Sequence, residues 1–450
     1  MAGVVLSPCG CRRCPRRAAI PECAAGFGIS KKVKCMQTDV VVLGAGIIGV
    51  SAALHLQARG RSVVLLDRRG AGEETSHGNA GLIERASVVP YGFPRDLASL
   101  FRYGLNRSAE AHYHLAFLPK VAPWLAQYWW HSSPRRHAVA ARAMLPLIER
   151  CVTEHEALMR EADILPMLRR IGWIKGFRDK AEFQLAEEEA RASAALYGLK
   201  LEVLSGADLR AKEPHLTGDF AGGLHWLDPA SVPDPGAVTR AYAELFEKRG
   251  GRFLRGDARS LVASGSGWTV AAEEGPVTAR EVVVALGPWS GEIFRPLGYR
   301  IPLAVKRGYH MHYRPAGNAV LNHPLYDVSG GYLIVPMTRG IRLTTGAEFA
   351  DRDAAPSPVQ LAQVEPEARR VFPLGERVDP EPWIGARPCL PDMRPVIGEA
   401  PRHKGLWFAF GHNHHGFTLG PVTGHLLAQM MAGEATLTDP APYAVGRFGR

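Results

Sequence analysis

The chain has 450 residues, of which 46% are hydrophobic and 22% are charged. These fractions exclude the disordered and fibrous classes of protein. The formal net charge is +10, but residues 1–35 alone carry seven Lys and Arg side chains against a single acid. The rest of the chain is only mildly basic, so its charge gives no reason to expect a nucleic-acid partner.

The first 35 residues differ in composition from the rest. They hold five of the seven cysteines, and only Cys151 and Cys389 lie beyond them. The three cysteines of residues 9–14 have no second ligand pair at zinc-site spacing, so we expect no bound metal. We expect residues 1–35 to form a disordered basic extension. An export signal is the alternative, but a proline and an acid interrupt its apolar stretch.

Two widely separated cysteines in the remaining chain suit a reducing compartment. The sequence has no uninterrupted run of about 18 apolar residues, the length that a transmembrane helix requires. We therefore expect a cytoplasmic protein without a transmembrane segment.

The first folded unit is predicted to be a strand, a helix and a second strand. An apolar strand over residues 39–43 leads into residues 44–49, which read GAGIIG, and a helix pattern continues to about residue 59. In this fingerprint Gly44 makes the tight turn, Gly46 lets the backbone approach a pyrophosphate, and Gly49 lets helix and strand pack closely.

Two further features complete this pattern. The helix N-terminus, at Ile47 and Ile48, presents free N–H groups and a partial positive charge to phosphates. The second strand ends at Asp67, 21 residues after Gly46, where a carboxylate can accept hydrogen bonds from a ribose diol, with Arg68 beside it. The pattern predicts a dinucleotide site, but it does not decide between NAD and FAD.

Further along the chain, residues 96–200 are predicted to be helix-rich and aromatic, with a long amphipathic helix over residues 180–196. Strand patterns return over residues 221–286 and 300–350. A last strand, residues 406–410, precedes a glycine-rich turn and a helix over residues 417–431.

Nucleotide-binding character at both ends, with unlike material between, predicts a discontinuous domain. We expect a cofactor domain of residues 36–95, 205–300 and 380–435. Residues 96–204 and 301–379 would form an inserted substrate domain, and residues 436–450 a C-terminal tail.

Four segments carry a resemblance to a known family. They are residues 75–83 (TSHGNAGLI), 385–388 (GARP), 391–398 (PDMRPVIG) and 411–416 (GHNHHG). In this order they resemble the D-amino-acid dehydrogenase and oxidase (DAO) family of FAD-dependent oxidoreductases, near the bacterial D-amino-acid dehydrogenases. The resemblance implies an α/β (α+β) fold, with a Rossmann-type FAD-binding domain and an inserted substrate domain built on a large antiparallel sheet.

The resemblance also implies the cofactor and its contacts. FAD would lie against the fingerprint and against two later glycine-rich segments. The additional contacts that it implies are Ser76, Asn79, Ala80, Gly81, Leu82, Ala258, Gly287, Gly411, Gly416, Phe417 and Thr418. Cys389 lies only three residues before Asp392, which does not match the register of covalent flavin attachment in related sarcosine oxidases, so we expect non-covalent FAD.

Three residues are implied as substrate contacts. Arg387 matches the family arginine that binds the substrate carboxylate, and a planar guanidinium can hold a carboxylate by two parallel hydrogen bonds. Its alternative is a surface ion pair. Tyr332 resembles a family tyrosine that assists at the carboxylate, with core packing as the alternative. His412 would contact substrate or flavin, or fill a turn. No acid or cysteine completes a metal set with His412, His414 and His415.

The function implied is oxidative deamination of a small, D-configured amino acid to the 2-oxo acid and ammonia, by hydride transfer from Cα to flavin N5. No side chain is expected to act as a strong base. Secondary amines such as sarcosine, proline or hydroxyproline, and a flavin-binding subunit of a larger complex, remain alternatives. The electron acceptor, whether oxygen, quinone or another carrier, is not readable. The tryptophans of residues 124–130 would pack in the core or contact the inner membrane peripherally.

Overall fold

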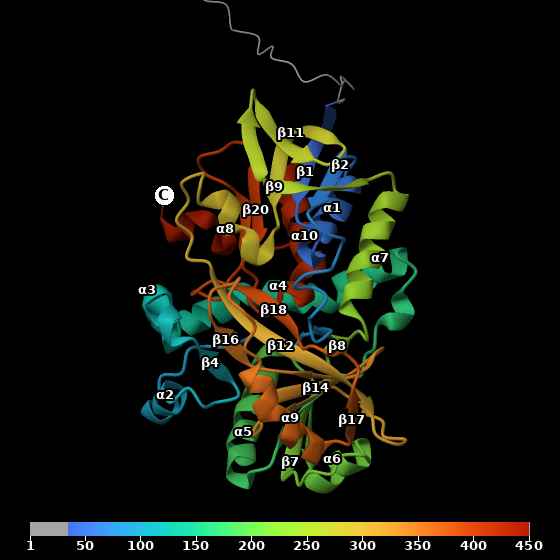
Figure 1. Cartoon of the computed structure of the whole chain (residues 1–450), viewed down its shortest axis with the longest axis vertical. Helices are drawn as coiled ribbons and strands as arrows, with labels where there is room; N and C mark the ends of the chain where they lie inside the picture. Colours follow the sequence, from blue (N-terminus) through green and yellow to red (C-terminus); the bar gives the residue numbers. More distant parts are fainter. Residues whose placement is uncertain (1–34, 450) are drawn as a thin grey trace, which may run out of the picture.

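The computed structural model describes residues 35–449, and its elements are organised around two β-sheets placed one above the other along the long axis (Figure 1). The predicted basic extension and its cysteine run lie outside the described residues, apart from Cys35. None of the helices in the described part is both long and apolar enough to cross a membrane.

The first sheet has seven strands and a parallel centre. Its strands are β1 (Met36–Leu43), β2 (Val63–Asp67), β9 (Arg252–Ser264), β10 (Gly267–Ala272), β11 (Gly275–Val284), β19 (Val396–Glu399) and β20 (Leu406–Phe410). β1 pairs in parallel with β2 and β11, β2 with β9, and β11 with β20. β10 joins β9 to β11 as an antiparallel meander, and β19 closes the edge next to β20.

The centre of this sheet is buried on both faces. Val40 and Val42 of β1 belong to one apolar cluster, and Val41 and Leu43 belong to another, as the two-residue period of a strand requires. Helices cover the first face: α1 (Ile47–Gln57), α4 (Pro134–Glu161), α7 (Pro235–Lys248) and α10 (Gly416–Ala432). The short α8 (Gly291–Phe294) contributes to the second face.

α1 and α10 come from opposite ends of the chain and pack against each other (Figure 1). A Cβ at Gly424 would lie 2.5 Å from the backbone of Ser51, and one at Gly420 would lie 2.5 Å from the Ile47 side chain. Only glycine permits this approach, so the two helices can bring their N-termini to the same end of the sheet. The sequence-predicted C-terminal helix is confirmed.

The second sheet has eleven strands and is mostly antiparallel. Its strands are β4 (Ala111–Tyr113), β5 (Trp173–Phe177), β6 (Leu201–Ser205), β7 (Gly222–Trp226), β12 (Ala304–Pro315), β13 (Leu325–Asp327), β14 (Tyr332–Met337), β15 (Gly340–Thr344), β16 (Ala347–Phe349), β17 (Leu374–Arg377) and β18 (Trp383–Cys389). Only the β13–β5 and β16–β4 pairs are parallel. The predicted α/β class, with a large antiparallel sheet in the second part, is confirmed.

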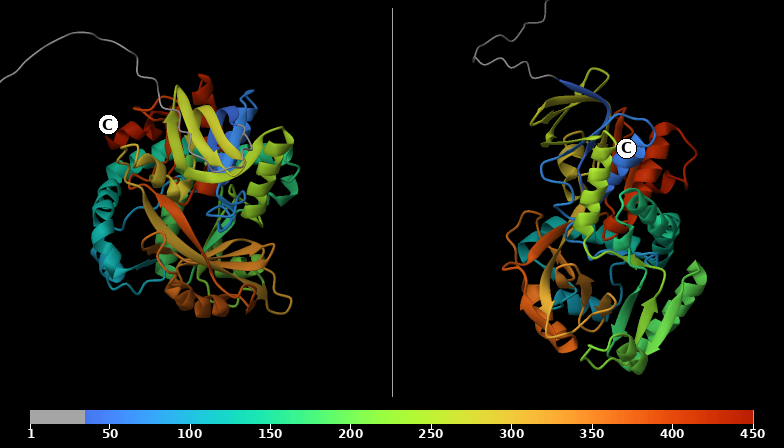
Figure 2. Two further views of the ribbon diagram at one scale, coloured as in Figure 1. Left: turned by 45° about the horizontal axis from the view of Figure 1, so that its top comes forward. Right: turned by 90° about the vertical axis from the view of Figure 1, so that its right-hand side faces the viewer.

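Helices and a small ribbon complete this part of the molecule. The helices are α2 (Leu97–Gly104), α3 (Leu118–His131), α5 (Lys180–Tyr197), α6 (Gly206–Lys212) and α9 (Val359–Val371). The two-stranded ribbon pairs β3 (Leu82–Ile83) with β8 (Ala230–Ser231). Figure 2 shows how β12 and β18 run side by side at the junction of the two halves.

The chain crosses between the two halves more often than the predicted domain boundaries allow. β7 lies within residues 205–300, assigned to the cofactor domain, yet it pairs with β5 and β6 in the second sheet. β18 lies within residues 380–435 but pairs with β12. α4, assigned to the substrate domain, packs on α10 instead. Apolar strands read alike in either sheet, so composition alone did not reveal these crossings.

The C-terminal tail packs on the fold. The Tyr443 hydroxyl donates to the backbone carbonyl of Ala143, and Arg447 pairs with buried Asp392 at 2.7 Å.

Candidate active site

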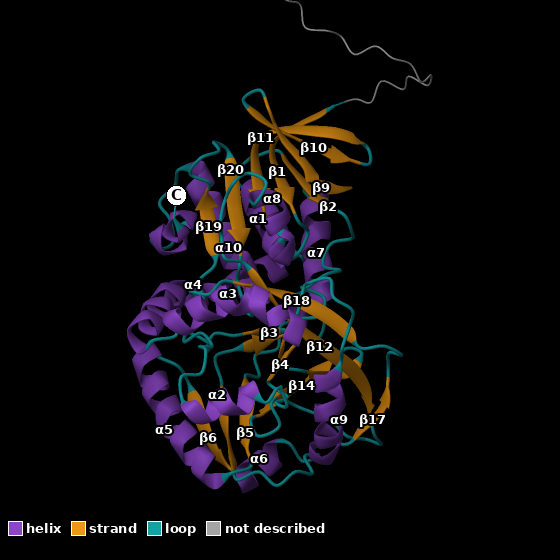
Figure 3. Cartoon of the chain, turned by 60° about the vertical axis from the view of Figure 1, so that its left-hand side comes forward, coloured by secondary structure: helices purple, strands orange, loops and turns teal. Residues whose placement is uncertain are grey.

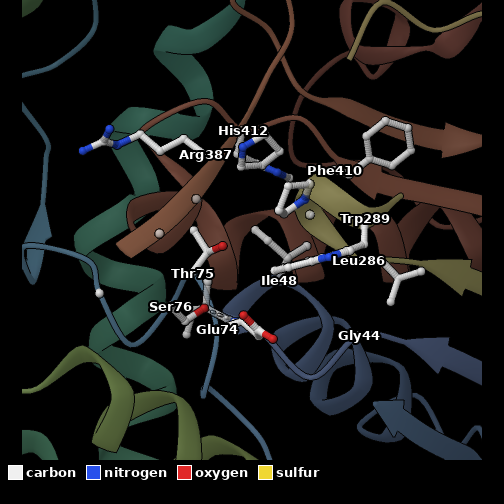
Figure 4. A pocket seen from close by; sticks show the side chains of 18 of the residues that line it. Gly44, Ile48, Glu74, Thr75, Ser76, Leu286, Trp289, Arg387, Phe410 and His412 are labelled. Atoms are coloured by element: carbon white, nitrogen blue, oxygen red, sulfur yellow. Dashed lines mark hydrogen bonds between the residues drawn. The ribbon is translucent and has the colours of Figure 1, made fainter. Parts of the chain in front are cut away.

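A cavity of about 1010 Å³ lies between the two halves of the molecule. Its walls come from the β1–α1 turn, residues 74–84, β9 to β11, β12, β18 and the loop before α10. In the close view of Figure 4, Gly44 lies at the lower right and Arg387 at the upper left, with Ile48 and His412 between them. The two ends differ in how they are built.

The fingerprint end is formed by backbone packed at close range. Gly44 has φ +106°, and a Cβ there would lie 2.5 Å from the Ala285 carbonyl oxygen. A Cβ at Gly49 would lie 1.8 Å from the Gly44 carbonyl oxygen. A Cβ at Gly46 would meet only the Ser76 hydroxyl, at 3.4 Å. The first and third glycines are therefore required by packing, while the middle one leaves space on the cavity side.

Polar groups at this end are satisfied by the backbone. One Asp67 oxygen accepts from the Ala45 N–H at 2.7 Å, and the other accepts from the Arg69 N–H at 3.1 Å. Burial raises the pKa of Asp67, and these N–H donors oppose the shift. The Ser76 hydroxyl accepts from the Ile47 N–H at 3.0 Å, in the first turn of α1. The Arg68 guanidinium lies over the Trp289 ring, 4.4 Å from its centre.

Residues 76–81 form a turn that is stabilised by hydrogen bonds from the second sheet. The Asn79 side chain accepts from the Gly81 N–H at 2.7 Å, and Gly81 has φ +71°. Buried Arg342 of β15 donates to the backbone carbonyls of His77 and Asn79 and, through Nε, to His312 at 3.0 Å. The second sheet thus fixes the position of this loop.

Most of the predicted cofactor contacts line the cavity. They are Gly44, Gly46, Ile47, Ile48, Asp67, Arg68, Ser76, Asn79, Ala80, Leu82, Ala258, Gly287, Gly416 and Phe417. Gly49, Gly81, Gly411 and Thr418 are not in the lining. Gly49 and Gly81 support the turns behind it, and the Thr418 hydroxyl donates to the Leu82 carbonyl at 3.2 Å, which ties the loop to α10.

Arg387 enters the cavity from β18. Its Nη1 donates to the carbonyls of Arg307 and Gly346, both at 3.3 Å, and it forms no ion pair with any of residues 35–449. A Cβ at Gly308 would lie 2.6 Å from Nη1, so this glycine makes room for the guanidinium. Burial lowers the pKa of Arg387. Arg387 is half-buried, and its desolvation without a carboxylate partner costs free energy that a bound anion would offset.

His412 also lines the cavity, but its ring is already engaged. Its Nε2 bonds to the Thr423 hydroxyl at 3.0 Å, and burial lowers its pKa to about 3. The ring is therefore neutral at pH 7. Its side chain is held in place by α10 and cannot carry a charge to a ligand.

Tyr332 does not reach the cavity. Its ring lies in the apolar cluster under the second sheet, and its hydroxyl lies 3.5 Å from Arg178 Nη2. The next residue, Leu333, lines the cavity instead, because successive residues of β14 face opposite sides. Tyr332 therefore lies on the face of β14 that points away from the cavity, and not where its predicted role at the substrate carboxylate requires it.

Several cavity residues were not identified from the sequence. The lining also contains Glu84, Tyr91, His310, Tyr326, Trp383 and His414. The His310 ring stacks on Trp383 with centroids 4.8 Å apart, and its Nδ1 is buried without a partner in the described chain. Of these, His414 lies in the recognised 411–416 segment and Glu84 follows the 75–83 segment, while nothing in the local sequence marks the other four.

An acid does lie beside the histidine cluster, which corrects the sequence-based statement that none completes it. One oxygen of Glu84 and one ring nitrogen each of His414 and His415 lie within 4.8 Å of one another. Glu84 is 330 residues from His414 in the chain, so only the fold brings them together.

The family was identified by comparison with known proteins. A family described as FAD dependent oxidoreductase (DAO) matches residues 39–430. The chain belongs to this family. A D-amino-acid oxidase of Bradyrhizobium diazoefficiens is 28% identical to this DAO protein over 424 residues, covering 91% of this chain and 98% of that protein. A D-amino acid dehydrogenase of Chromohalobacter salexigens is 30% identical over 425 residues, covering 91% and 99%.

Solved structures share the fold of the DAO protein at lower identity. Glycine oxidase from Geobacillus kaustophilus superposes with a TM-score of 0.70 at 21% identity, covering 92% of this chain and 99% of that one. L-proline dehydrogenase from P. horikoshii superposes with a TM-score of 0.69 at 17% identity, covering 92% and 98%. The predicted family, fold class and FAD cofactor are confirmed.

The cavity residues fit FAD. The Gly44 turn and the N-terminus of α1 suit a pyrophosphate, and Asp67 retains acceptor capacity for a ribose diol. The backbone of residues 76–80 and 385–388 would lie along the ring system. The DAO protein is therefore an FAD-dependent oxidoreductase, and the cavity between its two sheets has the residues to hold the cofactor.

Proposed function

We propose that this DAO protein oxidises the Cα–N bond of a small amino acid, with preference for the D configuration, to an imino acid that hydrolyses to the 2-oxo acid and ammonia. The observation that carries the proposal is Arg387, a half-buried guanidinium without an ion-pair partner among the described residues, in the cavity that fits FAD. The proteins named D-amino acid dehydrogenase and D-amino-acid oxidase, each matched over 91% of this chain, support the substrate class.

Arg387 would orient the substrate. Its Nη1 is anchored on two backbone carbonyls, which leaves the rest of the guanidinium fork to bind a carboxylate and fix its rotation. Bound FAD supplies the two-electron acceptor that receives the hydride. The protein contributes orientation and exclusion of water, and the α10 N-terminus beside Gly416 places a positive dipole end at the cavity wall.

The test is an anaerobic bleaching screen of the purified holoprotein. Glycine, both enantiomers of alanine and of proline, and sarcosine are added without oxygen, and flavin absorbance is followed. Faster bleaching by the D enantiomers is expected. Preference for sarcosine or proline would assign secondary amines instead. No bleaching by any amine would contradict the proposal and favour a flavin-binding subunit of a larger complex.

We further propose that FAD is bound without a covalent bond. Cys389 is buried, its backbone pairs with His412, and its side chain does not line the cavity. Intact mass after denaturation should equal that of the polypeptide alone. A mass heavier by one FAD would contradict this.

We also propose peripheral contact with a membrane surface through α2 and α3, as a route to a quinone acceptor. Leu97, Phe101 and Trp130 are exposed by 84%, 71% and 53%, and α2 has no buried residue. Arg95 and Arg136 stack on the neighbouring Trp129 and Trp130 rings. Figure 3 shows α2 and α3 on the same side of the molecule. Apolar side chains beside cations suit an anionic lipid surface.

This surface is tested by sedimentation with anionic and neutral vesicles. Binding to anionic vesicles, lost in Leu97→Ser/Phe101→Ser, is expected. Equal recovery in the supernatant for both forms would leave these residues without a membrane role.

A further inference from the structure

Glu84 is an acid in the cavity wall without a basic partner. It follows β3 directly and lies where the FAD-binding loop turns toward the second sheet. The Ser87 hydroxyl donates to one of its carboxylate oxygens, and no lysine, arginine or histidine of residues 35–449 forms an ion pair with it. Its backbone N–H is held by the Thr418 hydroxyl at 3.2 Å. The carboxyl group is therefore fixed in position while retaining acceptor capacity toward the cavity.

His414 lies beside Glu84 and is also without a partner. Its Nε2 is buried with no hydrogen bond in the described chain, and the same holds for Nε2 of His415. The His414 ring contacts the Tyr91 ring, with centroids 4.7 Å apart, and the His415 ring, at 3.7 Å. Burial and the neighbouring charges of His415 and Arg387 keep the pKa of His414 well below its usual value. His414 is thus a neutral imidazole close to both Glu84 and Arg387.

At this end the cavity offers a cation without an ion pair, Arg387, and a carboxyl group without an ion pair, Glu84. Arg387 matches the carboxylate of an amino acid, and Glu84 matches its ammonium group. A site that binds only a carboxylate would need no acid near Arg387, because desolvating half-buried Glu84 without an ion-pair partner costs free energy. The pair is complementary to a zwitterion.

We propose that Glu84, with His414 beside it, accepts the proton that the substrate's ammonium group must lose before hydride transfer. The inference rests on the proposed function. The proton passes from the ammonium nitrogen to a Glu84 carboxylate oxygen, so the substrate becomes a neutral amine and Glu84 a neutral acid. Bound FAD would supply the acceptor for the hydride from Cα, and the nitrogen lone pair freed by this proton transfer would form the C=N bond.

The surroundings of Glu84 suit this transfer. Burial raises the pKa of Glu84, which makes its carboxylate a stronger base, while the Ser87 hydrogen bond and the charge of Lys175 on β5 oppose the shift. The other titratable groups beside it are Tyr91, Cys151 of α4 and the two histidines. Burial shifts the pKa of each of these four groups in favour of its neutral form. Among these groups only the Glu84 carboxylate is negative, and a proton that it receives removes that charge.

Two other roles for the cluster predict different results. If Glu84 recognised a hydroxyl or amino group on the substrate side chain, only substrates carrying such a group would depend on it. If Glu84, His414 and His415 held a metal ion, the purified protein would retain one metal per chain and lose it when Glu84 is changed.

The experiment measures flavin reduction in Glu84→Gln under anaerobic conditions from pH 6 to pH 10, with glycine and D-alanine. Glutamine keeps the shape but cannot accept the proton. We expect reduction about 100-fold slower than in the wild type at pH 7. The defect should shrink to within about threefold near pH 10, where the free amine is already neutral. Glu154→Gln removes another partly buried acid, which pairs with His425 at 3.0 Å outside the cavity, and should behave as the wild type.

A second readout does not depend on turnover. 2-Aminoisobutyrate has no Cα hydrogen, so it can bind to the oxidised holoprotein without reacting, and the flavin spectrum reports its binding. The wild type should bind it with nearly constant affinity from pH 6 to pH 8. In Glu84→Gln the Kd should fall about tenfold per pH unit, as the neutral amine becomes available.

Three results would overturn the inference: an unchanged rate of Glu84→Gln with glycine and D-alanine, a defect independent of pH, or a stoichiometric metal that is lost with Glu84. FAD content and thermal stability of each variant separate these from misfolding, and a variant that binds FAD poorly is replaced by Glu84→Asp, which should restore part of the rate at pH 7. If the wild type is not reduced by any amine, the proposed function fails and the inference fails with it.

Discussion

The two ends of the cavity are built differently, one mainly from backbone and the other mainly from side chains. At the fingerprint end, Gly44, Gly49 and Asp67 form a site from backbone and short-range contacts, and Asp67 is satisfied by N–H groups. At the other end, Glu84, Arg387 and His414 come from three segments; the first two have no ion pair among residues 35–449, and the buried Nε2 of His414 has no hydrogen bond there. Backbone packing defines a cofactor site, whereas unsatisfied side chains indicate where substrate chemistry takes place.

The largest expected effect is the loss of FAD binding when the backbone-built end of the cavity is disrupted. Gly49→Ala places a methyl group 1.8 Å from the Gly44 carbonyl oxygen, and neither backbone can move without opening the β1–α1 turn. We expect the purified protein to contain no FAD. Flavin absorbance per polypeptide measures this, with Gly446→Ala as control, because a Cβ there meets nothing within 4 Å. Full FAD content in Gly49→Ala would show that the turn can relax.

The next largest effect concerns Arg387 at the side-chain end. Arg387→Met should retain FAD but lower kcat/KM by about 100- to 1000-fold, the scale of losing a charged bidentate pair. Steady-state kinetics with the best substrate of the bleaching screen measure this. Arg402→Met is the control, since Arg402 stacks on Tyr299 outside the cavity. Unchanged kinetics would remove Arg387 from substrate binding.

Acid should destabilise the side-chain end. Burial lowers the pKa of His412 to about 3 and that of His415 to about 4, below the value near 6.5 in the unfolded chain. Between about pH 6.5 and pH 4 these histidines bind protons in the unfolded state but not in the folded state. The free energy of unfolding therefore decreases as the pH is lowered through this range. Each group contributes about 1.4 kcal/mol per pH unit.

Chemical denaturation at several pH values measures this slope. The slope of the unfolding free energy against pH reports how many more protons the unfolded state binds than the folded state. In His415→Asn this number should be smaller by about one. A free energy of unfolding that stays level down to pH 4.5 would mean that the rings are protonated in the folded protein.

Asp67 gives a smaller effect, because its present bonds are to the backbone. Asp67→Asn keeps the acceptor for the Ala45 N–H and removes the charge offered to a ribose diol. The Kd for FAD should rise about tenfold, equivalent to about 1.4 kcal/mol. Titration of the apoprotein with FAD measures the Kd, and Asp39→Asn, at the start of β1 and away from the cavity, is the control.

Tyr332→Phe should have the smallest effect on catalysis. Its hydroxyl points to the Arg178 side of the sheet, so kcat/KM should change by less than about twofold, and only stability should fall, by about 1 kcal/mol. A large loss of kcat/KM would mean that Tyr332 faces the substrate after all, and that the register of β14 differs from the structure.

The sequence predicted well where a signal is local. The β1–α1–β2 unit requires glycines and an acid within 24 residues, and each has a reason that the structure bears out. Tyr332 was misplaced because a strand pattern fixes which residues alternate but not which face meets the cavity. Glu84 was missed because its meaning depends on His414, and no pattern in one chain reports a contact across 330 residues.

The packing of α1 on α10 has a consequence for biosynthesis. α1 is made early, but the helix that covers it ends at residue 432 of 450. β1 can pair with β2 at once, while its other edge stays open until β11 is made. The apolar helix α1 stays uncovered until the ribosome has almost finished. Nascent chains stalled before residue 416 should therefore bind chaperones and no FAD, since cofactor capture comes as the closing event of folding.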